Sequence, residues 1–78
     1  MSDQSLQRVV TLVAETLRIS PSKVNGASSI DTLSEWDSEA HMEICLAFEE
    51  RFGIVLDMDM IGEMTSVAAL AKVLDRRS

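Results

Sequence analysis

The residue with the clearest chemical potential is Ser38, which lies in the run EWDSEAH at positions 35–41. Its side chain is an alcohol that can be esterified with a phosphate. The run follows a long loop and opens a predicted helix, where free backbone N–H groups and the positive end of the helix dipole stabilise negative charge. An attachment point there is also exposed, so a long arm could swing outward. The position therefore suits a phosphodiester on Ser38.

Two other roles for Ser38 are open from the same residues. The first is a helix N-cap, and the pair Asp37-Ser38 taken alone favours this simpler role. The second is a hydrolytic pair with His41. No glycine-flanked nucleophile elbow surrounds Ser38, and His41 is the only histidine of the chain. We therefore expect His41 to be a buried or half-buried side chain beneath the loop, and the protein not to be an enzyme.

Two amphipathic helices flank this region. Apolar residues at spacings of three and four predict a first helix over residues 3–18, with a cap at Ser2 or Asp3. The same spacing predicts a second helix over residues 38–52, and Gly53 is a natural C-cap because glycine adopts the left-handed conformation easily. The attachment site thus opens the second helix.

A long connection over residues 20–37 joins these helices, and Pro21 prevents the first from continuing into it. Loops of more than about 12–15 residues are uncommon in compact domains unless they are functional or held by their own side chains. We therefore expect the loop to pack down through four apolar residues: Val24, Ile30, Leu33 and Trp36.

The rest of the chain predicts an extended link at residues 54–56, a short helix over residues 57–63 and a last helix capped by Thr65 or Ser66. Four methionines could form an adaptable binding face, but we expect them to fill the core around the short helix: Met42, Met58, Met60 and Met64. The predicted fold class is all-α, a bundle of three main helices plus one short helix, with residues 1–78 forming a single domain.

Charge is unevenly placed along the chain. The 78 residues carry 13 acids and seven bases, a formal net charge of −6, and residues 35–50 hold six of the acids and no base. This pattern disfavours a nucleic-acid partner, since phosphate binding needs lysine and arginine. It favours a basic protein partner. A solvated helix face without a partner is the alternative that the charge pattern leaves open.

Composition excludes several kinds of site. No apolar run approaches the roughly 20 residues of a membrane span, and the start of the chain does not resemble a secretory signal. The lone Cys45 excludes an internal disulfide and a cysteine-built zinc site, and is expected to be a small core residue. Asp57, Asp59 and Gly62 have the spacing found at the start of a calcium loop. Ala68, however, stands at the twelfth position, where a bidentate Glu is required. We expect no metal site and a cytoplasmic protein.

The chain resembles the acyl carrier protein family over essentially its full length. The residues that carry the resemblance are Asp37-Ser38, the run AFEERFGI at 47–54 and the run MTSV at 64–67, in that order. The run WDS followed by His41 is especially similar to free-standing bacterial carriers outside the housekeeping fatty-acid set. The resemblance implies an acyl-carrier-protein-like bundle in which Ser38 receives 4′-phosphopantetheine from coenzyme A. It also implies that Asp37 helps the transferase and its metal ion.

The resemblance further implies a docking face on the second helix. The partner-binding candidates are Glu39, Met42, Glu43, Leu46 and Glu49. The inward-facing positions are Ala40, Ile44, Cys45, Phe48 and Phe52. Glu39 departs from the leucine or methionine usual after the serine. A charge there removes an apolar partner contact and adds repulsion beside a phosphate, which would narrow the set of accepting enzymes or slow the modification.

The implied function is that of a carrier that holds acyl intermediates as thioesters on the arm and delivers them in fatty acid or polyketide biosynthesis. The implied partners are a phosphopantetheinyl transferase and acyl-activating or acyl-transferring enzymes with basic docking patches, with no nucleic acid or membrane. Two alternatives are open: an amino-acyl or aryl carrier for a peptide-synthesis type pathway, and an unmodified helical interaction module, which Glu39 keeps open. We expect a monomer.

Overall fold

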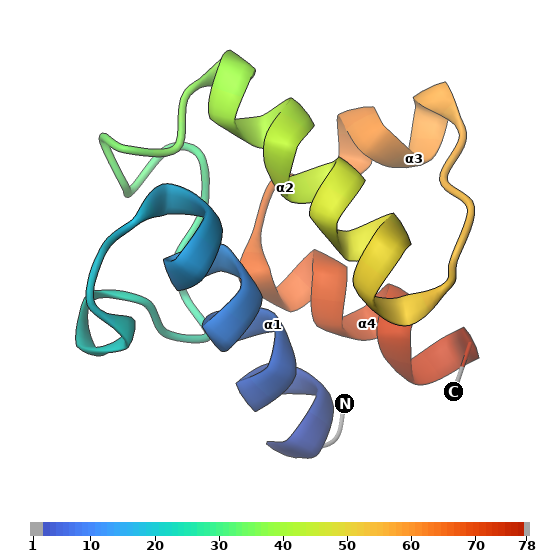
Figure 1. Cartoon of the computed structure of the whole chain (residues 1–78), viewed down its shortest axis with the longest axis horizontal. Helices are drawn as coiled ribbons and strands as arrows, with labels where there is room; N and C mark the ends of the chain where they lie inside the picture. Colours follow the sequence, from blue (N-terminus) through green and yellow to red (C-terminus); the bar gives the residue numbers. More distant parts are fainter. Residues whose placement is uncertain (1–2, 78) are drawn as a thin grey trace.

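The computed structural model describes residues 3–77, which form four α-helices and one short 3₁₀ helix (Figure 1). In chain order the elements are α1 (Asp3–Leu17), η1 (Pro21–Lys23), α2 (Ser38–Phe52), α3 (Met58–Glu63) and α4 (Val67–Arg77). Within the described residues the only strand-like pairing is an isolated antiparallel bridge between Ser29 and Ser66. The predicted all-α bundle is confirmed. The cap predicted at Ser2 lies outside the described residues.

α1 ends in a Schellman motif, one residue earlier than predicted. Arg18 has φ 60°, in the left-handed region. Its N–H donates to the Glu15 carbonyl at 3.2 Å, and the N–H of Ile19 donates to the Ala14 carbonyl at 3.0 Å. These two bonds satisfy carbonyls that the helix end would otherwise leave without partners. The chain therefore turns at Arg18, before Pro21 is reached.

The core is formed by α1, α2 and α4, with α1 packed against the other two. Its largest fully buried side chains come from all three helices and from the loop: Trp36, Phe48, Leu12, Ile44, Leu70, Val9, Val13, Val67 and Cys45. Of the inward positions expected on α2, Ile44, Cys45 and Phe48 are buried, whereas Ala40 and Phe52 are half-buried. The hydroxyl of Ser5 bonds to the carboxylate of Asp75, which ties α1 to the end of α4.

The long loop before α2 is packed down as predicted. Trp36 and Val24 are buried, and Ile30 and Leu33 are half-buried against the core. Backbone bonds also join the loop to the start of α4, and the sequence did not predict them. The Ile30 N–H donates to the Thr65 carbonyl at 2.9 Å. The N–H of Val67, the first residue of α4, donates to the Ser28 carbonyl at 3.0 Å.

Local capping sets the remaining boundaries. Gly53 is left-handed (φ 66°) and ends α2, as predicted. The Asp57 carboxylate accepts the N–H of Met60 at 2.8 Å and starts α3. Ser66, rather than Thr65, accepts the N–H of Ala69 at 3.1 Å in the first turn of α4. Residues 54–56 lie in neither a helix nor a strand, in agreement with the link expected between α2 and α3.

Candidate functional site

Ser38 is the first residue of α2 and is exposed. The residue before it, Asp37, has extended backbone (φ −96°, ψ −176°), and its Oδ1 accepts the N–H of Ala40 at 2.8 Å. The possibility that Ser38 is the N-cap is therefore wrong, because Asp37 supplies the capping oxygen. The structure brings the two residues together with separate tasks. Asp37 starts the helix, and Ser38 is presented at its first position.

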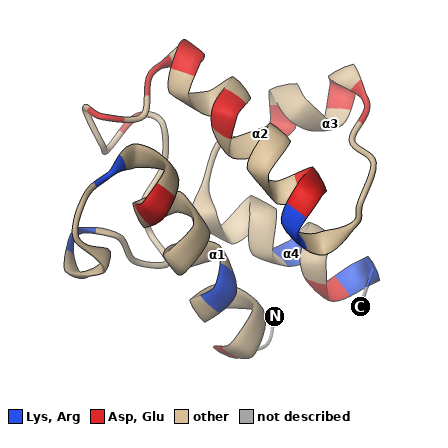
Figure 2. Cartoon of the chain, viewed as in Figure 1, with Lys and Arg blue, Asp and Glu red and all other residues tan. Residues whose placement is uncertain are grey.

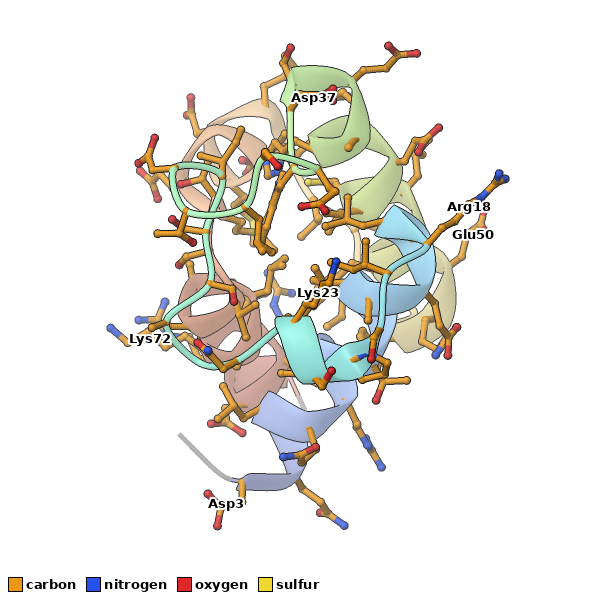
Figure 3. The ribbon with its side chains drawn as sticks, turned by 90° about the vertical axis from the view of Figure 1, so that its left-hand side faces the viewer. Asp3, Arg18, Lys23, Asp37, Glu50 and Lys72 are labelled. Carbon is orange, nitrogen blue, oxygen red and sulfur yellow. The ribbon has the colours of Figure 1, made fainter. Side chains whose placement is uncertain are left out.

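The start of α2 suits an anionic group. The first backbone bond of the helix runs from the His41 N–H to the Asp37 carbonyl at 2.8 Å, so the N–H groups of Ser38 and Glu39 precede the helical ladder. α2 has 15 residues, and its dipole places partial positive charge at this end. Figure 3 shows Asp37 at the opposite end of the molecule from Asp3. An exposed hydroxyl among such N–H groups fits a phosphodiester that carries a long arm.

The geometry at the start of α2 also gives the negative charge of Glu39 a structural role. It is exposed and lies in the first turn of α2. A carboxylate there is favourable to the helix dipole by about 0.3–1 kcal/mol. The charge that departs from the family pattern thus stabilises the helix that presents Ser38, although it also lies close to any phosphate attached there.

A buried polar link lies one turn behind Ser38. The Trp36 Nε1–H donates to His41 Nδ1 at 3.1 Å, and the His41 Nε2 lies 2.7 Å from the Ile61 carbonyl oxygen in α3. The indole nitrogen can only donate, so Nδ1 must accept and Nε2 must hold the proton that is donated to Ile61. The two rings are stacked, with centroids 6.0 Å apart and an interplanar angle of 27°. The prediction of a buried histidine beneath the loop agrees with this arrangement, since His41 is 7% exposed.

The docking candidates on α2 differ in their surroundings. Glu39 and Glu43 are exposed, and so are the apolar side chains of Met42 and Leu46, at 47% and 56%. Glu49 is only half-buried, and its carboxylate accepts the N–H of Leu56 at 2.8 Å in the extended link. Four of the five candidates therefore lie open to a partner, and the fifth also holds the chain between α2 and α3. Their part in docking stays a prediction.

Sequence reasoning missed part of the exposed apolar surface. Val55 and Met58, next to and at the start of α3, are 83% and 79% exposed. The expectation that the methionines fill the core is wrong for Met42 and Met58, which are exposed, although Met64 is buried. The sequence does contain a feature that indicates the exposure of Met58. This residue directly follows the Asp57 cap, and first-turn positions of a short surface helix are often exposed.

Acidic residues continue from α2 over α3, as Figure 2 shows. The residues of α3 and its cap add Asp57, Asp59 and Glu63, with no base among residues 52–71. Lysine and arginine lie instead on α1, on the loop that follows it, on the last turn of α2 and on α4 (Figure 2). The Ser38 end of the molecule is thus negative, and Arg51 at the other end of α2 pairs with Glu15 of α1 at 3.0 Å.

Cys45 behaves as a core residue. It is 2% exposed, and its Sγ lies 3.7 Å from Nε2 of His41. Burial raises the pKa of its thiol, and the negative charge of Glu49 adds to the effect. Among residues 3–77, no three His, Cys, Asp or Glu side chains are placed to hold a metal ion. Within the same range no helix is long and apolar enough to cross a bilayer.

Comparison with known proteins agrees with the geometry. The family model for the phosphopantetheine attachment site matches residues 7–74. The chain is similar to the acyl carrier proteins of Rhodopseudomonas palustris strains BisB18 and HaA2, with 37% identity over 73 residues in each case. These alignments cover 92% of this chain and 91% of each relative. The chain is also 28% identical over 78 residues to the acyl carrier protein of Trieres chinensis, covering 100% of this chain and 98% of that protein.

Proposed function

This chain belongs to the acyl carrier protein family, whose members bear phosphopantetheine and are carriers rather than catalysts, and we propose that Ser38 is its attachment residue. The observation that supports this most is the exposed Ser38 hydroxyl at the first position of α2, beside a carboxylate that caps the helix in its place. Neither capping nor burial competes for this hydroxyl. The helix start also offers N–H groups and a dipole to a phosphodiester.

Attachment is a phosphoryl transfer. The Ser38 oxygen attacks the β-phosphorus of coenzyme A and forms a new P–O bond. The bond from that phosphorus to the oxygen of the adenosine half breaks, so that adenosine 3′,5′-bisphosphate leaves. The hydroxyl proton passes to a base on the transferase. In this step Asp37 holds the helix start in place and offers a carboxylate to the transferase and its metal ion.

The proposed carrier function follows from the attached arm, which when bound supplies a thiol that holds an acyl group as a thioester. The chain itself supplies the tether and the recognition surface. Tethering raises the effective concentration of the cargo at a docked enzyme. We propose that Glu39, Met42, Glu43 and Leu46 form the centre of the docking face, where exposed apolar side chains lie among acids. Glu49 contributes at its edge.

The proposed partners are a phosphopantetheinyl transferase and acyl-activating or acyl-transferring enzymes with basic patches. Complementary charge speeds encounter and leaves affinity modest enough for the carrier to move between enzymes. The single carrier domain over residues 1–78, the monomeric state and the cytoplasmic location belong to the same proposal.

Intact-mass spectrometry tests the attachment. The protein is incubated with coenzyme A, magnesium and a broad-specificity transferase, beside Ser38→Ala and the control Ser34→Ala, which removes an exposed hydroxyl from the nearby loop. We expect a gain of one phosphopantetheine in the wild type and in Ser34→Ala, and none in Ser38→Ala. The proposal would be refuted if the wild type gained no mass with this transferase and also gained none with the transferase native to the source. The mass of the loaded form then separates an acyl cargo from an amino-acyl or aryl one.

A further inference from the structure

The buried link behind Ser38 joins three parts of the molecule through one side chain. His41 accepts from Trp36, which lies two residues before the attachment serine, and donates to the carbonyl of Ile61 in α3. It also begins the α2 ladder through its own N–H, which bonds to the Asp37 carbonyl at 2.8 Å. Both ring nitrogens are engaged, so the side chain couples these parts through hydrogen bonds as well as through packing.

Trp36 is the anchor of the segment that enters α2. It is 1% exposed, and its backbone N–H donates to the Leu33 carbonyl at 3.0 Å, which closes the last turn of the loop. Only Asp37 separates this indole from Ser38. The rotation of the indole within the core is fixed by its single polar bond, the one to His41, because a buried N–H left without an acceptor is costly. The bond to His41 therefore helps to hold the segment that leads into Ser38.

The other half of the link holds α3. None of the six residues of α3, all of which the structure describes, is fully buried, and Met60 and Ile61 are only half-buried. A short helix with so little buried surface is held weakly by packing. The hydrogen bond from His41 to the Ile61 carbonyl, 2.7 Å long and partly buried, thus fixes α3 beside the start of α2.

We propose that His41 is a positioning residue for the modification of Ser38. Through its two ring nitrogens it holds Trp36 on one side and α3 on the other, so that the serine is presented in a single orientation. This inference rests on the proposed function, since it concerns the same attachment reaction. His41 does not contact the reacting atoms, and it acts through the segment that it anchors. Loss of a positioning contact lowers the fraction of encounters with correct geometry.

The test measures transferase kinetics for His41→Leu, His41→Gln and Trp36→Phe. We expect Trp36→Phe to lower kcat for modification by about fivefold to tenfold, the effect of one lost hydrogen bond, and His41→Leu, which loses both bonds of the link, to lower it at least as much. KM should be nearly unchanged in both variants because the docking face is intact. His41→Gln should recover most of the rate, since its amide offers an acceptor and an N–H donor. The double variant should be no slower than His41→Leu alone, because the bond that Trp36→Phe removes is already lost there.

Ile44→Val is the matched control, since it removes one methylene from the same buried side of α2 and leaves the link untouched. It should be modified at the wild-type rate. Far-ultraviolet circular dichroism with thermal unfolding establishes that each variant is folded. Trp36 emission reports the indole environment in the variants that keep Trp36, independently of modification. Equal rates in folded His41→Leu and wild type would overturn the proposal, and so would a glutamine variant as slow as the leucine one or additive losses in the double variant. Failure of the proposed function is distinct, because then the wild type itself gains no mass.

Discussion

A pair of substitutions separates the capping role of Asp37 from the role that we propose for its charge in the transferase reaction. The structure shows it as the N-cap of α2, accepting the Ala40 N–H at 2.8 Å, and family resemblance assigns its charge to the transferase reaction. Asp37→Ala removes both the capping oxygen and the charge. Asp37→Asn keeps an oxygen of similar reach and removes only the charge, because asparagine caps helices about as well as aspartate.

The magnitudes follow from the cap. Loss of an N-cap costs about 1 kcal/mol, and for a domain of this size 1 kcal/mol lowers Tm by about 4–8 °C. Asp37→Asn forfeits only the charge–dipole interaction, about 0.3–1 kcal/mol at an exposed site. We therefore expect Tm to fall clearly in the alanine variant and by less in the asparagine variant, while modification of Ser38 slows in both.

Thermal unfolding by circular dichroism and intact-mass kinetics are the two assays. Asp57→Ala is the control, since Asp57 caps α3 through a bond of the same length, 2.8 Å to the Met60 N–H, and it should not slow modification. Equal losses of Tm in both Asp37 variants would refute the capping role. An asparagine variant that is modified at the wild-type rate would refute the role of the charge.

Further predictions concern charge, helix ends and the buried thiol. Glu43→Lys should weaken use by acyl-transferring enzymes several-fold at low salt and far less at about 1 M salt, where the screening length is about 3 Å; equal effects in kinetic assays at both salt concentrations would contradict electrostatic docking. Gly53→Ala should lower the free energy of unfolding by about 1–2 kcal/mol in urea titrations, because φ is 66° there. Gly62→Ala, with nothing within 4 Å of the added Cβ, should be neutral or stabilising by up to about 1 kcal/mol, and a loss as large as that at Gly53 would count against this reasoning. The raised pKa of Cys45 means that the unfolded chain releases the thiol proton first, so the free energy of unfolding should fall as pH rises above the ordinary value of 9.0. In Cys45→Ala this contribution to the pH dependence of the free energy of unfolding should be absent, as measured by urea titrations above pH 9.0.

Much of the fold was predictable because its boundaries are local. Gly53 and Asp57 end and start helices through bonds to neighbours a few residues away, and such patterns are visible in the sequence. The end of α1 was less visible, since Arg18 takes a left-handed conformation that its residue type does not favour, and Ile19 completes the motif. The bridge between Ser29 and Ser66 joins distant parts of the chain through backbone atoms, which every residue type carries alike.

The candidate site divides in the same way. Ser38 and its exposure follow from the local run. The pair Asp37-Ser38 taken alone favoured Ser38 as the cap, whereas the structure shows that Asp37 supplies the capping oxygen. The link through His41 could not be predicted in full, because one of its ends is the main-chain carbonyl of Ile61. The hydrogen bond of Glu49 could not be predicted for a similar reason, because its partner is the backbone N–H of Leu56. Spacing identifies a helix face, but it does not show which carboxylate on that face is already engaged.

The backbone bonds between the long loop and the start of α4 also determine where the chain can change length. They fix the chain at Ser28 and Ile30, downstream of the exposed segment at residues 20–23. Residues inserted or deleted in that segment are absorbed before this fixed point and leave the register of Ser38 unchanged. An insertion between Ile30 and Trp36 has no such point behind it and shifts the indole that anchors α2. The two halves of one loop are therefore open to different kinds of evolutionary change, the first in length and the second in side chains only.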